Sequence, residues 1–234
     1  MARFPRWLGV LFGAAAAAAT ACAAPAAAPA PVAGAEYAIR WNPRDGGPAT
    51  AAETLALLGL RAKHSARFSV DYYDLPAATA TPGFATILRQ RIDATGHATV
   101  TWKLRGDQPL SRWVCPLGDA RDAKAEVDVE FDGVDTVSRR YSYSCMSDDL
   151  EAASALLSAR ANGCPAAVTR KDAGRVRVEE WRLPGGALLL EVSGSGADTS
   201  AALTRFRLQV VVPLLAAGIR PAQESKTDRV SRCP

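Results

Sequence analysis

Basic side chains recur at a spacing of two residues in the stretch ILRQRIDATGHATVTWKLRG, residues 87–106. Arg89 and Arg91 come before a turn sequence, and Lys103 and Arg105 come after it. Residues two apart lie on the same face of a β-strand, so the stretch predicts a hairpin with its cations gathered on one face. Guanidinium groups bind phosphate oxygens through paired hydrogen bonds, and such a face could therefore hold a polyanion.

Carboxylates alternate with apolar residues in the same way further along the chain. Glu126, Asp128 and Glu130 share one face of the stretch AEVDVEF, and Glu179 and Glu191 lie on the polar faces of two later stretches. Carboxylate oxygens bind Mg²⁺ or Mn²⁺, and such an ion can bridge the oxygens of a bound phosphate. The polar faces therefore contain both halves of a metal-assisted polyanion site.

Two arrangements of the strands remain open. In the first, an antiparallel sheet packs its apolar face on helices and leaves its charged face in water, which is the usual arrangement for a single hairpin. In the second, the sheet closes into a barrel and collects the charged residues in a polar interior. Several stretches share the same polarity, and this agreement favours an α+β fold: a closed antiparallel β-barrel with helices packed on its outer face.

The remaining patterns divide the chain into elements. Strands and hairpins are predicted at residues 36–41, 67–75, 87–105, 125–145 and 175–194. Helices are predicted at residues 50–60 and 147–163. Residues 198–218 begin and end with helical patterns, but RFRLQVVV within them is open to a strand, and Pro213 marks a kink or a boundary.

The first 21 residues have the features of a secretory signal peptide. Arg3 and Arg6 precede the apolar stretch WLGVLFGAAAAAA, which is too short to span a bilayer comfortably. Residues 22–35 form an Ala/Pro tether, and one folded domain is expected over residues 36–234. The letters ATAC, ending at Cys22, are similar to the lipobox of bacterial lipoproteins, whereas an ordinary signal peptidase site would discard Cys22. We therefore expect an exported protein, either periplasmic or anchored to the cell envelope by a lipid on Cys22.

The four cysteines beyond Cys22 fit no CxxC metal site. An even number of cysteines in an exported chain suggests two disulfides, for which three connectivities are possible. The pairing that we expect is Cys115 with Cys145 and Cys164 with Cys233.

Charge and motifs argue against several other functions. The net charge of +4 over 234 residues includes Arg3 and Arg6, and the +2 that remains without them is too small a bias to suggest a nucleic-acid-binding protein. The two histidines, His64 and His97, belong to no HExxH motif, and the chain has no GxSxG elbow and no P-loop lysine. A basic site must therefore be a local arrangement of charges.

The order of the stretches resembles that of the CYTH superfamily, the triphosphate tunnel metalloenzymes that include class IV adenylate cyclases and thiamine triphosphatases. YYDLP followed by LRQR and TWKLRG is similar to the central signature of that family, and the closing SKT resembles its terminal Ser-Lys element. The likeness covers most of residues 36–228. It implies a barrel with a basic tunnel that binds triphosphate- or polyphosphate-type anions together with Mg or Mn.

Carried over position by position, the resemblance implies a set of phosphate-binding cations and two metal ligands. The cations are Arg40, Arg89, Arg91, Lys103, Arg177 and Lys226. The metal ligands are Glu36 and Glu191.

The opening ExExK motif of the family is incomplete in this chain. Its positions are occupied by Glu36, Ala38 and Arg40, so the middle acid is absent. Ser193 stands beside Glu191 where a second acid is usual, and the carboxylates of AEVDVEF and Glu179 are the candidate substitutes. Because the family's hydrolytic mechanism needs several carboxylates around its metal ions, this departure weakens the inference of catalysis more than the inference of binding.

Two functions follow as hypotheses. The first is an exported CYTH-like domain that binds a triphosphate- or polyphosphate-type anion, with Mg- or Mn-dependent phosphohydrolase activity left open. The second is a catalytically inactive cell-envelope protein that uses the barrel as a structural or protein-interaction module. The two hypotheses differ in whether the basic residues bind a phosphorylated ligand.

Overall fold

The computed structural model describes residues 32, 34–75, 80–117, 121–149, 165–224 and 226–230. Several sequence-based predictions lie outside these residues. They are the signal peptide, the lipid anchor at Cys22, the body of the helix at 147–163, and the pairing of Cys164 with Cys233.

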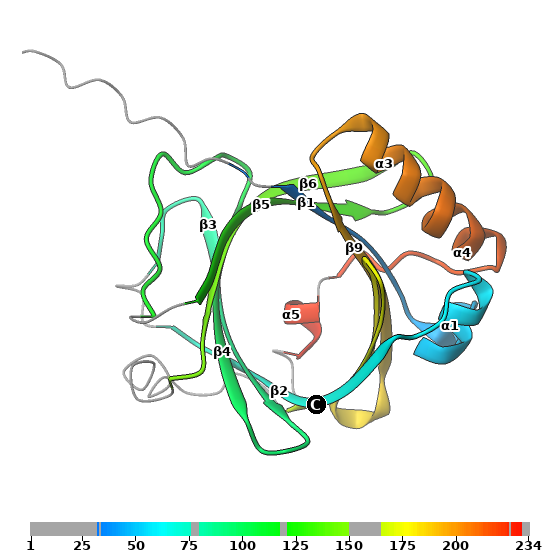
Figure 1. Cartoon of the computed structure of the whole chain (residues 1–234), viewed down its shortest axis with the longest axis horizontal. Coiled ribbons are helices and arrows are strands. Elements are labelled where there is room, and N and C mark those ends of the chain that lie inside the picture. Colours follow the sequence, from blue (N-terminus) through cyan, green and yellow to red (C-terminus); the bar gives the residue numbers. More distant parts are fainter. Residues whose placement is uncertain are drawn as a thin grey trace, which may run out of the picture.

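Nine strands of the described chain close into a barrel, with the order β1-β5-β6-β4-β3-β2-β7-β8-β9 around the ring (Figure 1). Their bounds are β1 Gly34–Trp41, β2 His64–Tyr73, β3 Phe84–Asp93, β4 Ala98–Gly106, β5 Arg121–Phe131, β6 Val137–Ser147, β7 Ala166–Ala173, β8 Val176–Arg182 and β9 Leu188–Gly196. The closed-barrel prediction is confirmed, and so are the three hairpins, which are β3–β4, β5–β6 and β8–β9. The barrel is not antiparallel throughout, because β1 pairs with β5 in parallel.

The faces of the strands follow the predicted alternation. On β5, for example, Val127, Val129 and Phe131 are buried on the outer face, while Glu126 and Asp128 are buried on the inner face. Closure removes the polar face of every strand from bulk water, so these carboxylates lie in the barrel interior. The alternative of an open sheet with a solvated charged face is therefore wrong.

Three helices cover the outer face of β1, β5, β8 and β9 (Figure 1). They are α1 Ala51–Leu57, α3 Ser200–Phe206 and α4 Val212–Ala216, and short 3-10 turns lie at Pro43–Asp45 and Pro184–Gly186. Thr50 caps α1 as predicted, because its side chain accepts a hydrogen bond from the Glu53 amide at 3.1 Å. The largest apolar core of the described chain lies between these helices and the barrel, and it includes Trp41, Phe131 and Leu214.

The stretch RFRLQVVV is helical, so its reading as a strand is wrong. Arg207–Val211 forms a π-helical segment that joins α3 to α4 without a break. Val210 and Val211 are buried against the barrel, and this burial outweighs the strand preference of consecutive valines. Pro213 lies in the first turn of α4, directly after the π segment, where its missing N–H is most easily tolerated.

A second covering layer lies over the outer face of β3, β4 and β6. Residues 107–117 follow β4 and place Leu110, Trp113 and Leu117 against Trp102 and Tyr143. The predicted disulfide between Cys115 and Cys145 is confirmed, and it ties this segment to β6. The segment takes the place of a helix on this side of the barrel.

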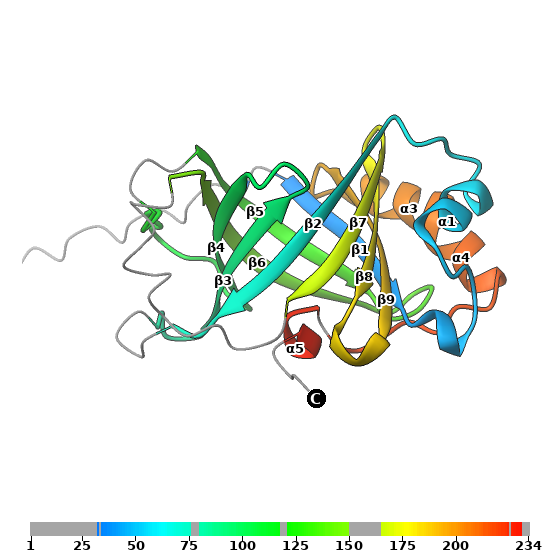
Figure 2. The ribbon, with the colours of Figure 1, turned by 90° about the horizontal axis from the view of Figure 1, so that it is seen from below.

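One end of the barrel interior is filled with apolar side chains. The buried members of this cluster are Val70, Tyr72, Ala166, Val168, Trp181, Leu183 and Leu189. The short helix α5, Lys226–Val230, lies inside the outline of the ring in Figure 1 and at one end of the barrel in Figure 2. Its Lys226 ammonium sits 5.0 Å from the centre of the Trp181 ring. The polar part of the interior therefore has a floor formed by this cluster and α5.

Within the described ranges, none of the helices has the length and apolar content needed to cross a bilayer.

Candidate anion-binding site

A cavity of about 440 Å³ occupies the polar part of the interior. Every strand and α5 contribute side chains to its wall. Among the described residues, nine basic and seven acidic side chains line it. A volume of this size suits a small-molecule ligand, and the wall chemistry suits a charged one.

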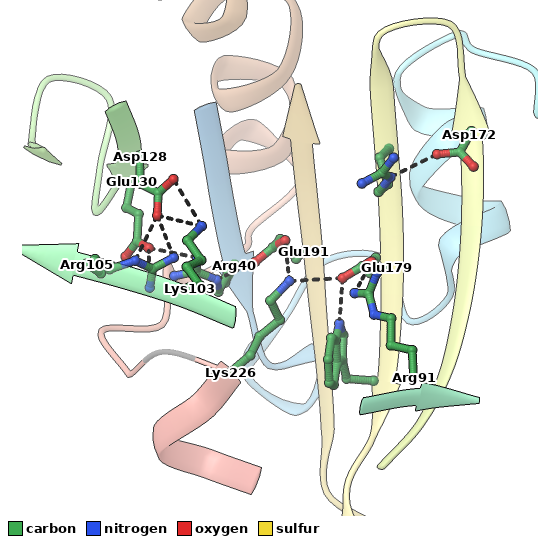
Figure 3. A network of polar contacts seen from close by, with 12 residues as sticks. Arg40, Arg91, Lys103, Arg105, Asp128, Glu130, Asp172, Glu179, Glu191 and Lys226 are labelled. Atoms are coloured by element: carbon green, nitrogen blue, oxygen red, sulfur yellow. Dashed lines mark hydrogen bonds and ion pairs between the residues drawn. The ribbon is translucent and has the colours of Figure 1, made fainter. Parts of the chain in front are cut away.

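Two cations on β4 neutralise a carboxylate on β5. Lys103 Nζ lies 2.9 Å from Asp128 Oδ2, and Arg105 Nη2 lies 2.6 Å from the same oxygen (Figure 3). Burial disfavours the Asp128 carboxylate, but Lys103 and Arg105 together outweigh burial and lower its pKa to about 2. The two strands are not neighbours in the ring, since β6 lies between them, so these contacts cross the interior.

Arg40 on β1 links this group to the rest of the wall. Its Nη2 donates to Glu130 Oε1 at 2.8 Å, and its Nε donates to Glu191 Oε2. Burial opposes the charged guanidinium, but Glu191 and Glu130 outweigh it and raise the pKa of Arg40. The pKa of Glu130 is lowered by the same contact. Burial raises this pKa, but Arg40 and then Arg105 outweigh burial and lower it to about 2.

A second group joins β3, β8, β9 and α5. Glu179 and Glu191 lie directly opposite each other on β8 and β9, and Lys226 Nζ donates to both, at 2.9 Å and 2.7 Å (Figure 3). Arg91 Nη2 donates to Glu179 at 3.0 Å. Burial would raise the pKa of Glu179, but Lys226 and Arg91 hold it well below its usual range. Two buried carboxylates that face each other thus stay ionised because cations surround them.

Arg89 differs from these cations, because no ion pair joins it to any described carboxylate. Its Nη2 lies 3.5 Å from Thr101 Oγ1, and its buried Nε has no hydrogen-bond partner in the described chain. Burial, and after it the charge of Arg91, lowers the pKa of Arg89. A guanidinium in this position favours an anion beside it.

Three carboxylates form a group that could hold a divalent cation. One oxygen from each of Glu36, Glu126 and Asp128 lies within 4.8 Å of the other two. Lys124 Nζ lies 2.9 Å from Glu126 Oε1, but burial and the neighbouring Glu36 outweigh this cation and raise the pKa of Glu126. Ser142, which pairs with Glu126 across β5 and β6, has a buried hydroxyl without a described partner. Carboxylate oxygens are the hard ligands that Mg²⁺ and Mn²⁺ prefer, and a bound ion would share Glu126 with Lys124 and Asp128 with Lys103 and Arg105.

All eight residues implied by the resemblance line the cavity. The structure does not bring the two implied metal ligands together, because Glu191 pairs with Arg40 while Glu36 lies four residues earlier on β1, about 13 Å along the strand. The Glu191 oxygens instead receive hydrogen bonds from Arg40 and Lys226. Arg177 lies at the wall with its Nε 2.9 Å from Asp172.

The sequence-based site omitted Arg170, Arg105 and Lys124, which also line the cavity. Arg170 was missed because β7 was not predicted as a strand. A signal for it was present, since Gly174 with φ +69° begins the turn into β8, and Ala166, Val168 and Arg170 alternate before it. Arg105 was assigned to the charged face, but no role was inferred for it.

No protein-family model matches the sequence, and no curated protein matches it. Similar solved structures include a protein from Vibrio parahaemolyticus with a provisional adenylate cyclase assignment, at 14% identity and a TM-score of 0.48, covering 84% of this chain and 98% of that chain. A protein from Pyrococcus horikoshii has 13% identity and a TM-score of 0.48, with 83% and 99% covered. A conserved hypothetical protein from Pyrococcus furiosus has 14% identity and a TM-score of 0.47, with 83% and 99% covered. The barrel assignment rests on the strand pairing described above.

Proposed function

We propose that this chain binds a triphosphate- or polyphosphate-type anion inside its barrel, as a divergent exported member of the CYTH superfamily. The observation that carries the proposal is the cavity itself: Arg89, Arg91 and Lys103 share it, and Arg89 has no described carboxylate partner. Guanidinium groups in a low-dielectric cavity recognise phosphate oxygens strongly. The family-like order of YYDLP, LRQR and TWKLRG supports the same conclusion.

A divalent cation fits the group of Glu36, Glu126 and Asp128, and we place Mg or Mn there. When bound, such an ion would neutralise charge on a phosphorylated ligand and draw its oxygens toward this wall. Glu191 has a different role in this account, because it balances Arg40 and Lys226.

We assign binding, and not efficient hydrolysis, to the cavity. Ala38 and Ser193 face each other on β1 and β9, where the family pattern has acids, so this part of the wall contributes no carboxylate. Beyond the group of Glu36, Glu126 and Asp128, the wall carboxylates Glu130, Glu179 and Glu191 are all engaged by cations of the chain. Carboxylates held in this way are poorly placed to bind a second metal or to activate water.

The expected place of action is outside the cytoplasm. The basic start and apolar stretch of residues 1–21 support export, and ATAC ending at Cys22 supports a lipid anchor on the cell envelope. In that compartment an inorganic polyphosphate is a more accessible ligand than a nucleoside triphosphate.

Titration calorimetry with tripolyphosphate, with and without Mg²⁺ or Mn²⁺, tests the proposal. We expect saturable binding by the protein and a loss of at least about tenfold in affinity for Arg89→Gln, since one charge-assisted contact contributes about 1.5–3 kcal/mol. Arg67→Gln is the matched control, because Arg67 is exposed on β2 outside the cavity wall.

Phosphate release measured in the same samples distinguishes binding from turnover. Rapid metal-dependent release would overturn the assignment of binding alone. An absence of tripolyphosphate binding at several pH values would remove the proposal and favour the alternative, an inactive structural or protein-interaction module.

A further inference from the structure

Exposed aliphatic side chains gather on the helices that cover the barrel. Five large apolar residues of the described chain are exposed, and three of them, Leu57, Leu208 and Val212, lie on these helices. Leu208 is 62% exposed. Single exposed aliphatic residues are common on protein surfaces, but a group of them on neighbouring elements marks an interaction site.

The helix that runs from α3 through the π segment to α4 carries aliphatic residues on both of its faces. Val210 and Val211 are buried against the barrel, whereas Leu208 and Val212 are exposed. Leu208 and Val212 are four residues apart, so they share one face of the helix. A covering helix normally has polar residues on its outer face, and the aliphatic residues found here are therefore free to make a contact outside the chain.

The helix α1 extends this apolar surface. It lies beside α4 in Figure 1 and again in Figure 2, and Leu58 at the end of α1 packs against the same apolar cluster as Leu215 of α4. Leu57, Leu208 and Val212 therefore belong to one side of the molecule, which we call the outer helix face.

Three exposed arginines lie on or beside the same helices. Arg205 is in the last turn of α3, and Arg61 and Arg220 directly follow Leu60 and Ile219, which belong to the apolar cluster beneath the helices. None of the three arginines forms an ion pair with a residue that the structure describes. Their charge is therefore available to a partner.

The acidic groups of this side are mostly engaged. Asp198 accepts a hydrogen bond from Arg139, and Asp135 lies 3.4 Å from Arg207. Glu53 accepts a hydrogen bond from a backbone amide just before α1. The uncompensated charge around the outer helix face is therefore positive, and an anionic surface complements it.

The chain that precedes the barrel reaches the same side of the molecule. Val32 packs against the apolar cluster beneath the helices. Val32 follows Cys22 by ten residues, which span at most about 35 Å when fully extended. A lipid on Cys22 would hold the outer helix face within reach of a bilayer, where even a weak contact becomes effectively intramolecular.

We propose that the outer helix face, together with its three arginines, docks on an anionic lipid bilayer. Aliphatic side chains enter the boundary between headgroups and acyl chains, and arginines beside them meet the lipid phosphates. A protein partner fits less well, because protein interfaces are usually centred on aromatic anchors and Phe206, the aromatic residue of this helix, is buried. The inference goes beyond the anion site in the barrel and takes only its setting, the cell envelope, from the proposed place of action.

Flotation of the mature chain, which begins at residue 22, with lipid vesicles tests the inference. The vesicles contain equal parts of phosphatidylcholine and phosphatidylglycerol, and Cys22→Ser removes the lipid acceptor so that partition reports the folded domain. We expect this chain to partition onto the vesicles, and the added pair Leu208→Ser, Val212→Ser to lower the partition coefficient by at least about tenfold. Val114→Ser is the matched control, since Val114 is 67% exposed in the covering segment over β3, β4 and β6.

The contribution of charge is measured with the same vesicles. We expect Arg205→Gln to lower the partition coefficient by about fivefold, because each basic residue near an anionic bilayer adds to the attraction. Vesicles of phosphatidylcholine alone should bind the unsubstituted face more weakly and should not distinguish Arg205→Gln from it. Arg112→Gln is the matched control, since Arg112 is exposed in the covering segment on another side of the barrel.

The outcomes separate the inference from the proposed function. An absence of partition onto the anionic vesicles, or partition by the Leu208→Ser, Val212→Ser chain within twofold of the parent, overturns the inference. Self-association that the same two changes abolish in sedimentation equilibrium would show that a second copy covers this face, and would also overturn it. Tripolyphosphate titration of the same samples tests the anion site independently. Urea denaturation shows whether each variant stays folded, and Leu208→Ser alone gives a second reading if the double change is unstable.

Discussion

Lys226 is the shared counterion of two buried carboxylates, Glu179 and Glu191, which face each other across β8 and β9. Both carboxylates are only 3–4% exposed, so solvent cannot replace the ammonium. We expect Lys226→Met to lower the free energy of unfolding by about 3 kcal/mol, because it leaves buried charge under-compensated while Arg40 and Arg91 remain. Urea denaturation followed by tryptophan fluorescence measures this loss.

A double variant supplies the control for Lys226. Adding Glu191→Gln to Lys226→Met removes one of the facing charges, so the pair of changes should destabilise the protein by less than the sum of the two single changes. Additive effects, or an unchanged stability for Lys226→Met, would show that the ammonium does not hold the two carboxylates.

At the residue scale, the sequence predicted which side chains face inward but not which of them pair. Alternation along each strand is a local property, and it placed Lys103 and Asp128 on polar faces correctly. Their contact depends on the order of strands around the ring, which the sequence does not reveal. The ion pair between Arg40 and Glu191 likewise requires the long-range pairing of β1 with β9.

The covering segment at residues 107–117 is an element whose position depends on the disulfide. The bond between Cys115 and Cys145 closes a loop with a sequence separation of 30 residues. In the chain-entropy account, a loop of this length contributes about 3–4 kcal/mol to stability. We expect the double variant Cys115→Ala, Cys145→Ala to unfold at a lower urea concentration by a corresponding amount.

Two further observations test the role of the covering segment. The ring centres of Trp113 and Tyr143 lie 6.0 Å apart. Without the disulfide, the segment should loosen and expose Trp113, so the tryptophan fluorescence should shift toward longer wavelength before global unfolding. Binding of tripolyphosphate should be retained, because the segment lies outside the barrel. A variant with unchanged stability and fluorescence would contradict this account of the segment.

Among the elements, hairpins were predicted well because both of their strands are close in sequence. β7 was missed because AAVTRKDA contains few residues with a strong strand preference. RFRLQVVV could instead be predicted as a strand that the structure does not contain, because consecutive valines favour strands. The same valines also suit the buried face of a covering helix, which is the structure that they form. Packing against the barrel decides between the two structures, and that packing is not visible in the local sequence.

At the scale of the whole molecule, the charged interior should make stability depend on pH. Asp128 and Glu130 have pKa values lowered to about 2 in the folded protein, below those of an unfolded chain. A carboxyl group whose pKa is lower in the folded protein than in the unfolded chain stabilises the folded state at pH values above its pKa in the unfolded chain. That stabilisation is lost as the pH falls toward its pKa in the folded protein. Each group should contribute about 2–3 kcal/mol, which is fully present above about pH 5 and lost by about pH 2.

Denaturation curves between pH 7 and pH 2 measure this dependence. The slope of stability against pH should be steepest between about pH 4.5 and pH 2, and Asp128→Asn should reduce it. A protein whose stability is constant over this range would contradict the interior ion pairs described for Asp128 and Glu130.

The central claim is that a phosphorylated anion binds inside the barrel, and a crystal structure of the protein soaked in tripolyphosphate tests it most directly. The account predicts phosphate density within hydrogen-bond distance of Arg89 and Arg91, with the barrel closed around it. Phosphate density confined to the outer surface, at a concentration that saturates binding in solution, would contradict the account.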